Sequence, residues 1–147
     1  MATFPDATVL AFDFGTRRVG VAIGNTLVSV AHPLVTIAGD SMATTLAAIA
    51  ALIDEWRPRQ LVVGLPTHAD GTPHAMTAQA AGFADALERR FGLPVARVDE
   101  RWTTAAAQDA LDARRAGRRG RAERDQVAAQ IILQAWFDER AGAPRSS

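Results

Sequence analysis

Two apolar runs near the start of the chain are separated by a short turn. Within each run, successive side chains alternate between two faces with the two-residue period of a β-strand. In the first run, Val9, Ala11 and Asp13 share one face. The second run, residues 19–24, is bulky on one face and carries only glycine or alanine on the other, which suits close approach by a backbone or a ligand. Gly15 lies in the turn and is free to take the positive φ that a turn can require.

The remaining pattern predicts three more strands and four helices. Strands are expected at residues 28–37, 61–65 and 94–98, and helices from residue 41 to a point before Pro58 and then at 75–91, 103–115 and 121–140. His32-Pro33 within the first of these strands indicates an edge strand or a bulge, because proline cannot donate to a central ladder. The uninterrupted apolar run at 61–65 is typical of a strand covered on both faces.

This order of elements predicts an α/β fold. The first three strands follow one another by short links and should be antiparallel, whereas strands separated by helices need crossover connections and should be parallel. The expected architecture is a mixed five-stranded sheet, with its first three strands antiparallel, flanked by helices. The chain has 147 residues, no internal repeat and no linker, so residues 1–147 are expected to form a single domain.

The charge of the chain is balanced overall but concentrated locally. All 16 basic residues are arginine, and 16 acidic residues offset them. Residues 114–124 hold six arginines against Glu123 alone, so this basic segment carries six minus one, or +5. Such a segment indicates an anionic partner, and the plainer alternative is a solvated loop and helix face. Its arginines are Arg114, Arg115, Arg118, Arg119, Arg121 and Arg124.

Composition excludes several classes of protein. The chain has no cysteine, so disulfides and thiolate metal sites are excluded. No apolar run approaches the roughly 20 residues of a membrane span, and residues 1–6 lack the character of a signal peptide, so a cytoplasmic protein that does not bind membranes is expected. The three histidines have no metal-type spacing, and no Gly-x-Ser-x-Gly motif supports a serine nucleophile.

Three carboxylates stand at positions that packing alone does not explain. Asp13 lies near the end of the first strand, Glu100 closes the last strand, and Asp125 shares a helix stripe whose other members are apolar. Each has a plainer interpretation, such as a turn cap for Asp13 or a helix-dipole partner for Asp125. The apolar members of the stripe are Ala128, Ala129, Ile132 and Trp136.

Taken together, the three carboxylates predict one site at an edge of the sheet, where open α/β sheets bind ligands. A site made only of carboxylate oxygens suits Mg²⁺ or Mn²⁺. Two such ions about 4 Å apart can activate a water and stabilise the leaving oxygen of a phosphodiester. The pattern therefore favours nuclease chemistry.

Arginines border each of these acids. Arg17 and Arg18 follow Asp13, Arg101 follows Glu100, and the basic segment leads into Asp125. We expect these arginines to hold the phosphates of a nucleic acid. Trp102 can stack on a base, although burial in the core is the commoner role of a large aromatic.

Four blocks of the sequence, taken in order, resemble the signature blocks of the YqgF/RuvX family of pre-ribosomal-RNA nucleases and Holliday junction resolvases. The resemblance spans nearly the whole chain. The blocks are residues 13–22, residues 63–66 with Asp70-Gly71, residues 99–104 and residues 125–133.

The resemblance implies an RNase H-like fold related to the RuvC resolvases. It implies a bacterial cytoplasmic protein that matures the 5′ end of pre-16S rRNA, with ribosomal precursor particles as partners. By position, the acidic residues of the family fall on Asp13, Glu100 and Asp125. Trp102 stands where the family more commonly has leucine. The RuvC relatives use four acids, and Asp99 is the candidate for the fourth, although the strand pattern turns it away from Glu100.

Other functions stay open at this point. The substrate can be branched DNA, with the protein acting as a Holliday junction resolvase in recombination or repair, and a symmetric cut would favour a homodimer over a monomer. The same fold can serve as a non-catalytic nucleic-acid-binding module. Asp13-Phe14-Gly15-Thr16 also resembles the phosphate loop of actin-like kinases and ATPases, but the chain is too short for their second domain.

Overall fold

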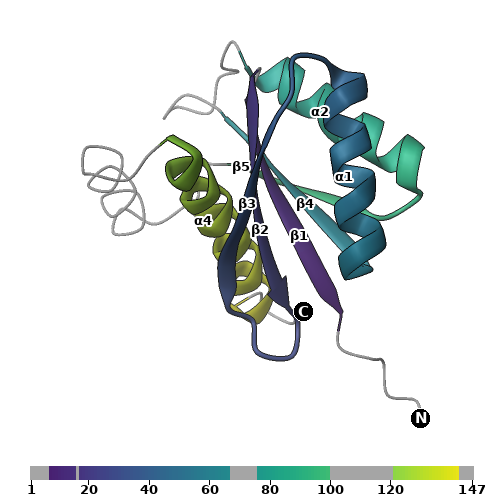
Figure 1. Ribbon diagram of the computed structural model, residues 1–147. Helices are drawn as coiled ribbons and strands as arrows, with labels where there is room; N and C mark the ends of the chain where they lie inside the picture. The colour runs from purple at the N-terminus through teal and green to yellow at the C-terminus, as the bar shows by residue number, and fades with distance from the viewer. Residues whose placement is uncertain (1–6, 16, 67–75, 100–120, 143–147) are drawn as a thin grey trace.

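The structure, a computed structural model, describes residues 7–15, 17–66, 76–99 and 121–142 (Figure 1). The helix predicted at 103–115 lies outside these residues. The described elements are β1 (Thr8–Phe14), β2 (Arg18–Asn25), β3 (Ala31–Ala38), α1 (Met42–Trp56), β4 (Gln60–Leu65), α2 (Thr77–Phe91), β5 (Val95–Asp99) and α4 (Arg121–Gly142). Each of the other elements predicted from the pattern is present.

The five strands form one mixed sheet in the order β3-β2-β1-β4-β5. The pairs β1–β2 and β2–β3 are antiparallel, and the pairs β1–β4 and β4–β5 are parallel. This arrangement confirms the predicted sheet. It also places β1 at its centre.

Strand β3 lies at one edge of the sheet and is irregular. Its register with β2 shifts between Val21 and Ala22, which pair with Val35 and Pro33. The expectation from His32-Pro33, an edge position or a bulge, is therefore confirmed by the edge position, and a register shift accompanies it.

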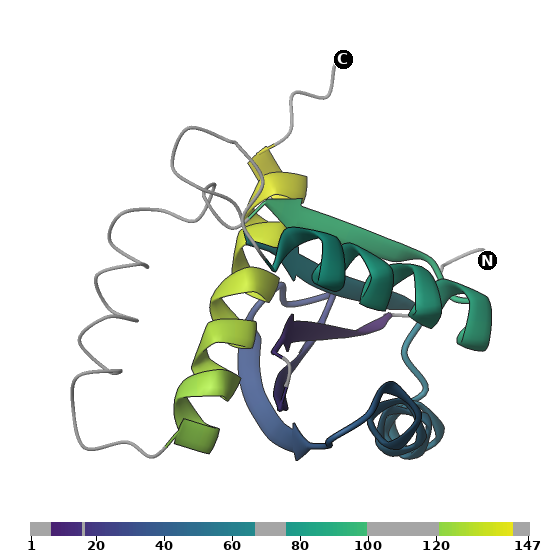
Figure 2. The ribbon, with the colours of Figure 1, turned by 90° about the horizontal axis from the view of Figure 1, so that it is seen from above.

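Helices cover both faces of the sheet, with α1 and α2 on one face and α4 on the other (Figures 1 and 2). Leu10 and Phe12 of β1 are fully buried in the core toward α1 and α2, where the rings of Phe12 and Phe83 meet edge to face. Val9 and Ala11 are buried in the second core, against α4. The predicted alternation of β1 is confirmed, and it assigns Asp13 to the α4 face.

The nearly bare face of β2 is where α4 comes closest to the sheet. A Cβ atom at Gly20 would stand 1.9 Å from the backbone carbonyl oxygen of Asp125, and one at Gly24 would stand 2.6 Å from the ring of Phe137. Only glycine permits these contacts, since real Cβ atoms do not approach so closely. The close approach expected at this face is therefore confirmed. The approaching group is the backbone of α4 at Gly20 and the ring of Phe137 at Gly24.

The turn between β1 and β2 uses Gly15 differently from the expectation. Gly15 does not have a positive φ; the one described glycine that does is Gly92, at 66°. The N–H of Gly15 instead donates to the carbonyl oxygen of Arg18 at 2.9 Å, and a Cβ atom at Gly15 would lie 2.7 Å from that oxygen. Close backbone approach, not a left-handed conformation, requires glycine here.

Helix α1 begins and ends at the predicted signals. The Ser41 side chain accepts a hydrogen bond from the Thr44 N–H, which is the usual N-cap contact. The helix ends at Trp56, Arg57 takes a left-handed conformation, and Pro58 follows. No helix in the described part of the chain is long and apolar enough to cross a membrane.

Ser41→Ala is expected to lower the free energy of unfolding by about 1 kcal/mol, because the Thr44 N–H loses its acceptor. Urea unfolding followed by circular dichroism measures the change. Ser41→Asn, which also caps helices, should retain most of the stability. Equal losses in the two variants would show that the cap is not the cause.

Arg97 of β5 ties the last strand to α2. Its guanidinium lies 2.6 Å from Asp85 and 3.3 Å from Glu88. Hydrogen bonds to Glu88 and Asp85 raise the pKa of Arg97 above its ordinary value. The cluster is largely exposed, so it aligns the two elements more than it stabilises them.

Candidate active site

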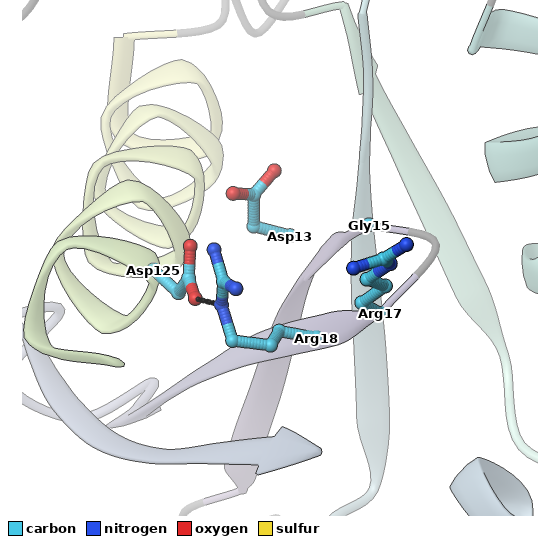
Figure 3. A pocket seen from close by; sticks show the side chains of 5 residues that line it. All are labelled: Asp13, Gly15, Arg17, Arg18 and Asp125. Carbon is cyan, nitrogen blue, oxygen red and sulfur yellow. Dashed lines mark hydrogen bonds and ion pairs between the residues drawn. The ribbon is translucent and has the colours of Figure 1, made fainter. Parts of the chain in front are cut away.

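A pocket of about 270 Å³ opens at the carboxyl end of β1. Figure 3 shows Asp13 and Asp125 projecting into it from the central strand and from α4. Two acids and two arginines therefore meet at the end of the central strand, where open sheets bind ligands. The lining residues are Asp13, Gly15, Arg17, Arg18 and Asp125.

Asp13 reaches the pocket because of its position on β1. It pairs across the antiparallel ladder with Gly20 of β2, and directly opposed residues of such a pair face the same side of the sheet. Because Gly20 has no side chain, the backbone of α4 at Asp125 comes down beside Asp13. Gly20 thus brings the two acids together, although sequence reasoning assigned it only to a bare strand face.

Asp125 faces the sheet, as its stripe on α4 predicts. Ala128, Ala129 and Ile132 of this stripe are buried, and Trp136 is partly buried. Asp125 is the fifth residue of the helix, beyond the first turn in which the helix dipole acts strongly. The helix-dipole interpretation is therefore weakened.

An ion pair joins Arg18 to Asp125. The Arg18 Nε donates to Asp125 Oδ2 at 2.6 Å, and the side chains are 36% and 23% exposed. This charge-assisted hydrogen bond connects the start of β2 to α4. Arg17 lines the same pocket, is exposed, and makes no side-chain hydrogen bond or ion pair to the described residues.

Two glutamines hold α4 against the start of β3. Gln134 accepts from the Ala31 N–H at 3.0 Å and donates to the Ser29 carbonyl oxygen at 3.1 Å, and Gln130 donates to the Ala31 carbonyl oxygen at 3.0 Å. Sequence reasoning missed both residues. Their i, i+4 spacing within an apolar helix was the available signal.

Several predicted site residues lie outside the described residues, namely Glu100, Arg101, Trp102, Arg114, Arg115, Arg118 and Arg119. Arg121 and Arg124 belong to the first turn of α4, and only their backbone is described. Strands β1, β4 and β5 run parallel, so their carboxyl ends share one side of the sheet. The last residue of β5 is Asp99, and Glu100 follows it in the chain.

The donor set of the pocket suits a hard cation. Asp13 and Asp125 offer carboxylate oxygens, and Mg²⁺ is commonly held by one or two carboxylates while it keeps several waters. At about 30 Å³ per water, the pocket volume of about 270 Å³ has room for a hydrated ion. Among the described residues no three His, Cys, Asp or Glu side chains form a metal-binding group, so a third carboxylate ligand would have to come from another part of the chain.

Comparison with solved structures identifies the class of fold. RuvC of Thermus thermophilus, solved in complex with a Holliday junction substrate, matches with a TM-score of 0.59 at 17% identity, over 92% of this chain and 96% of that chain. The yeast mitochondrial Holliday junction resolvase Ydc2 matches with a TM-score of 0.57 at 10% identity, over 95% and 81%. The fold is RNase H-like, as expected.

Sequence comparison identifies the family. The family model RuvX, described as Holliday junction resolvase, matches residues 7–139, and the chain belongs to this family. Relatives from Dechloromonas aromatica and Nitrosospira multiformis are 54% and 52% identical over 134 residues, covering 89% and 90% of this chain and 90% and 89% of theirs. Both are named "Putative pre-16S rRNA nuclease". The predicted family and the predicted enzyme class, a nuclease, are confirmed.

Proposed function

We propose that the protein is a metal-dependent endonuclease that hydrolyses phosphodiester bonds during 5′-end maturation of pre-16S rRNA. The observation that carries this proposal is the meeting of Asp13 and Asp125 in one arginine-lined pocket of an RNase H-like sheet. The names of the relatives at about half identity support the substrate. As part of this proposal, residues 1–147 form one domain, and the protein works in the cytoplasm.

In this proposal Asp13, Glu100 and Asp125 are the catalytic residues and hold Mg²⁺ or Mn²⁺. The bound ions would activate the attacking water and stabilise the leaving oxygen. Asp13 and Asp125 contribute fixed carboxylate oxygens from a central strand and a packed helix, so their positions cost little reorganisation. Arg17 is exposed at the pocket and binds a backbone phosphate.

The proposed nucleic-acid contacts extend along the basic segment. Arg18, Arg101, Arg114, Arg115, Arg121 and Arg124 complete them together with Arg17, Arg118 and Arg119. Six of these arginines lie within eleven residues, directly before and at the start of the helix that carries Asp125. A nucleic-acid strand bound at the pocket that Asp125 lines would therefore lie close to Arg121 and Arg124 in the first turn of α4.

Changing Arg118 and Arg119 together to Ala should weaken the salt dependence of nucleic-acid binding. The slope of the logarithm of the binding constant against the logarithm of the salt concentration should decrease in magnitude by up to about two, because each phosphate contact releases about one counterion. Fluorescence anisotropy with a labelled nucleic acid over a range of salt concentrations measures the slope. Arg89 and Arg90 form a matched adjacent pair on α2, across the sheet from α4. The double change of this pair should leave the slope as in the wild type. An unchanged slope in the Arg118, Arg119 variant would place the contact elsewhere.

A second candidate function is resolution of Holliday junctions, which the description of the matching family names. A resolvase would act as a homodimer on branched DNA, since a two-fold protein matches a symmetric pair of cuts. Pre-rRNA cleavage sets no such symmetry and is compatible with a monomer.

The test is cleavage by the purified protein, with Mg²⁺ or Mn²⁺, of a labelled small-subunit rRNA precursor and a labelled four-way DNA junction in parallel. Asp13→Asn and a reaction with EDTA are the controls. Cleavage of the precursor alone, lost in both controls, is the expected result. Cleavage of the junction alone would favour the resolvase function. Binding of either substrate without cleavage would favour a non-catalytic module.

A further inference from the structure

The guanidinium of Arg18 lies in the same pocket as the two carboxylates proposed to hold the cation. Its Nε lies 2.6 Å from Asp125 Oδ2, within the pocket that Asp13 also lines. In Figure 3 the side chain reaches from the start of β2 toward the space between the two carboxylates. A positive group of this chain is thus already bound to one of the expected ligands.

Charge balance explains the position of Arg18 beside Asp125. Two carboxylates at one partly buried site repel each other, and an opposite charge nearby relieves this cost. Asp125 is only 23% exposed, so water compensates its charge incompletely. Arg18 supplies one positive charge to this carboxylate, whereas a divalent ion would supply two.

Arg18 and a cation therefore conflict at Asp125. A metal ion coordinates through carboxylate lone pairs, and Oδ2 already accepts a short hydrogen bond from Arg18. An ion at this carboxylate would also be repelled by a guanidinium at hydrogen-bonding distance. An ion that coordinates Oδ2 would break or lengthen the Arg18–Asp125 hydrogen bond, and an ion at the other oxygen would still be repelled by the guanidinium.

We propose that Arg18 is a resident counter-ion that competes with the divalent cation for Asp125. In the cation-free protein it neutralises Asp125, and it leaves this carboxylate when the ion binds. Arg18 thereby sets the cation concentration at which the site fills. This inference rests on the proposed function, since it takes Asp13 and Asp125 as cation ligands.

Arg17 provides the matched comparison. It has the same charge and lines the same pocket, but it makes no ion pair with Asp125. If positive charge near the pocket lowered the cation affinity in general, both arginines would lower it. Competition for Asp125 is specific to Arg18.

The experiment is calorimetric titration of Mn²⁺ into the full chain without nucleic acid, for the wild type, Arg18→Gln and Arg17→Gln. Arg18→Gln should bind Mn²⁺ roughly fivefold more tightly, the factor that corresponds to the upper range for a partly exposed ion pair. Arg17→Gln should change the affinity by less than about twofold, since its charge is exposed and screened. Equal binding by Arg18→Gln and Arg17→Gln would overturn the inference in favour of a general charge effect, and weaker binding by Arg18→Gln would overturn it by showing that Arg18 supports the ion.

Failure of the inference is separable from failure of the proposed function. Asp13→Asn and Asp125→Asn should each weaken Mn²⁺ binding; if neither does, the cation site itself is wrong. If both do but Arg18→Gln does not bind more tightly, only the competition is refuted.

A measurement on the wild type keeps the inference testable if a variant does not fold. In ¹⁵N spectra of the arginine Nε–H groups, Mg²⁺ should shift the Arg18 signal and leave the Arg17 signal in place. An unmoved Arg18 signal at saturating Mg²⁺ would overturn the competition.

Discussion

Asp13→Asn should lower the rate of phosphodiester cleavage by about 10²- to 10³-fold, the scale seen when one preorganised stabilising group is removed from an active site. Asp13 projects from the central strand of the sheet into the pocket that Asp125 also lines. The amide of asparagine is nearly the same size but carries no charge, so it holds a divalent cation poorly. Single-turnover cleavage in Mg²⁺ measures the loss.

The same substitution should leave the affinity for nucleic acid unchanged or raise it. It removes a negative charge that lies near the phosphates of the bound strand, so repulsion between protein and ligand decreases. Anisotropy in EDTA measures this affinity separately from cleavage. Asp54→Asn is a charge-matched control, because Asp54 is exposed on α1, across the sheet from the pocket. Full cleavage by Asp13→Asn would refute the assignment.

Gly20→Ala is expected to have the second large effect, on both stability and cleavage. The added Cβ would stand 1.9 Å from the carbonyl oxygen of Asp125, and this neighbour is backbone that cannot rotate away. Helix α4 must therefore move off the sheet. Overpacking of this kind costs up to about 3 kcal/mol, and the accompanying shift of Asp125 relative to Asp13 should lower the cleavage rate.

Gly82→Ala is the matched control for the Gly20 variant. Gly82 lies in α2, and a Cβ at this position would meet no atom within 4 Å. This change should raise the free energy of unfolding by about 0.5–1 kcal/mol, since alanine favours a helix interior over glycine. Urea unfolding and single-turnover cleavage of both variants give the comparison. Wild-type stability and cleavage in Gly20→Ala would contradict the role assigned to the close approach of α4.

Much of this architecture follows from local sequence patterns. Period-two alternation placed Asp13 on the face opposite Leu10 and Phe12, and helical spacing turned Asp125 toward the sheet. The proline at position 33 predicted an edge strand or a bulge, and the strand lies at the edge of the sheet with a register shift beside the proline. These predictions succeeded because each depends on a short stretch of chain and on one simple geometric rule.

Features that depend on distant contacts were not predictable in the same way. The pair of Arg18 with Asp125 joins residues 107 positions apart, and it depends on how the β1–β2 turn lies against α4. Gly15 was interpreted as free to take a positive φ, but the close approach of its backbone to the Arg18 carbonyl oxygen, which leaves no room for a Cβ atom, explains the glycine instead. The roles of Glu100 and the basic segment stay predictions, because Glu100 and residues 114–120 are not among the described ones and residues 121–124 are described in their backbone alone.

The most direct test of the central claim, that Asp13 and Asp125 form one cation site, is anomalous diffraction at the manganese edge from crystals of the full chain grown with Mn²⁺. The account predicts an anomalous peak in the pocket, in contact with carboxylate oxygens of both residues, and no such peak in crystals of Asp13→Asn. Manganese bound only elsewhere on the protein would contradict it.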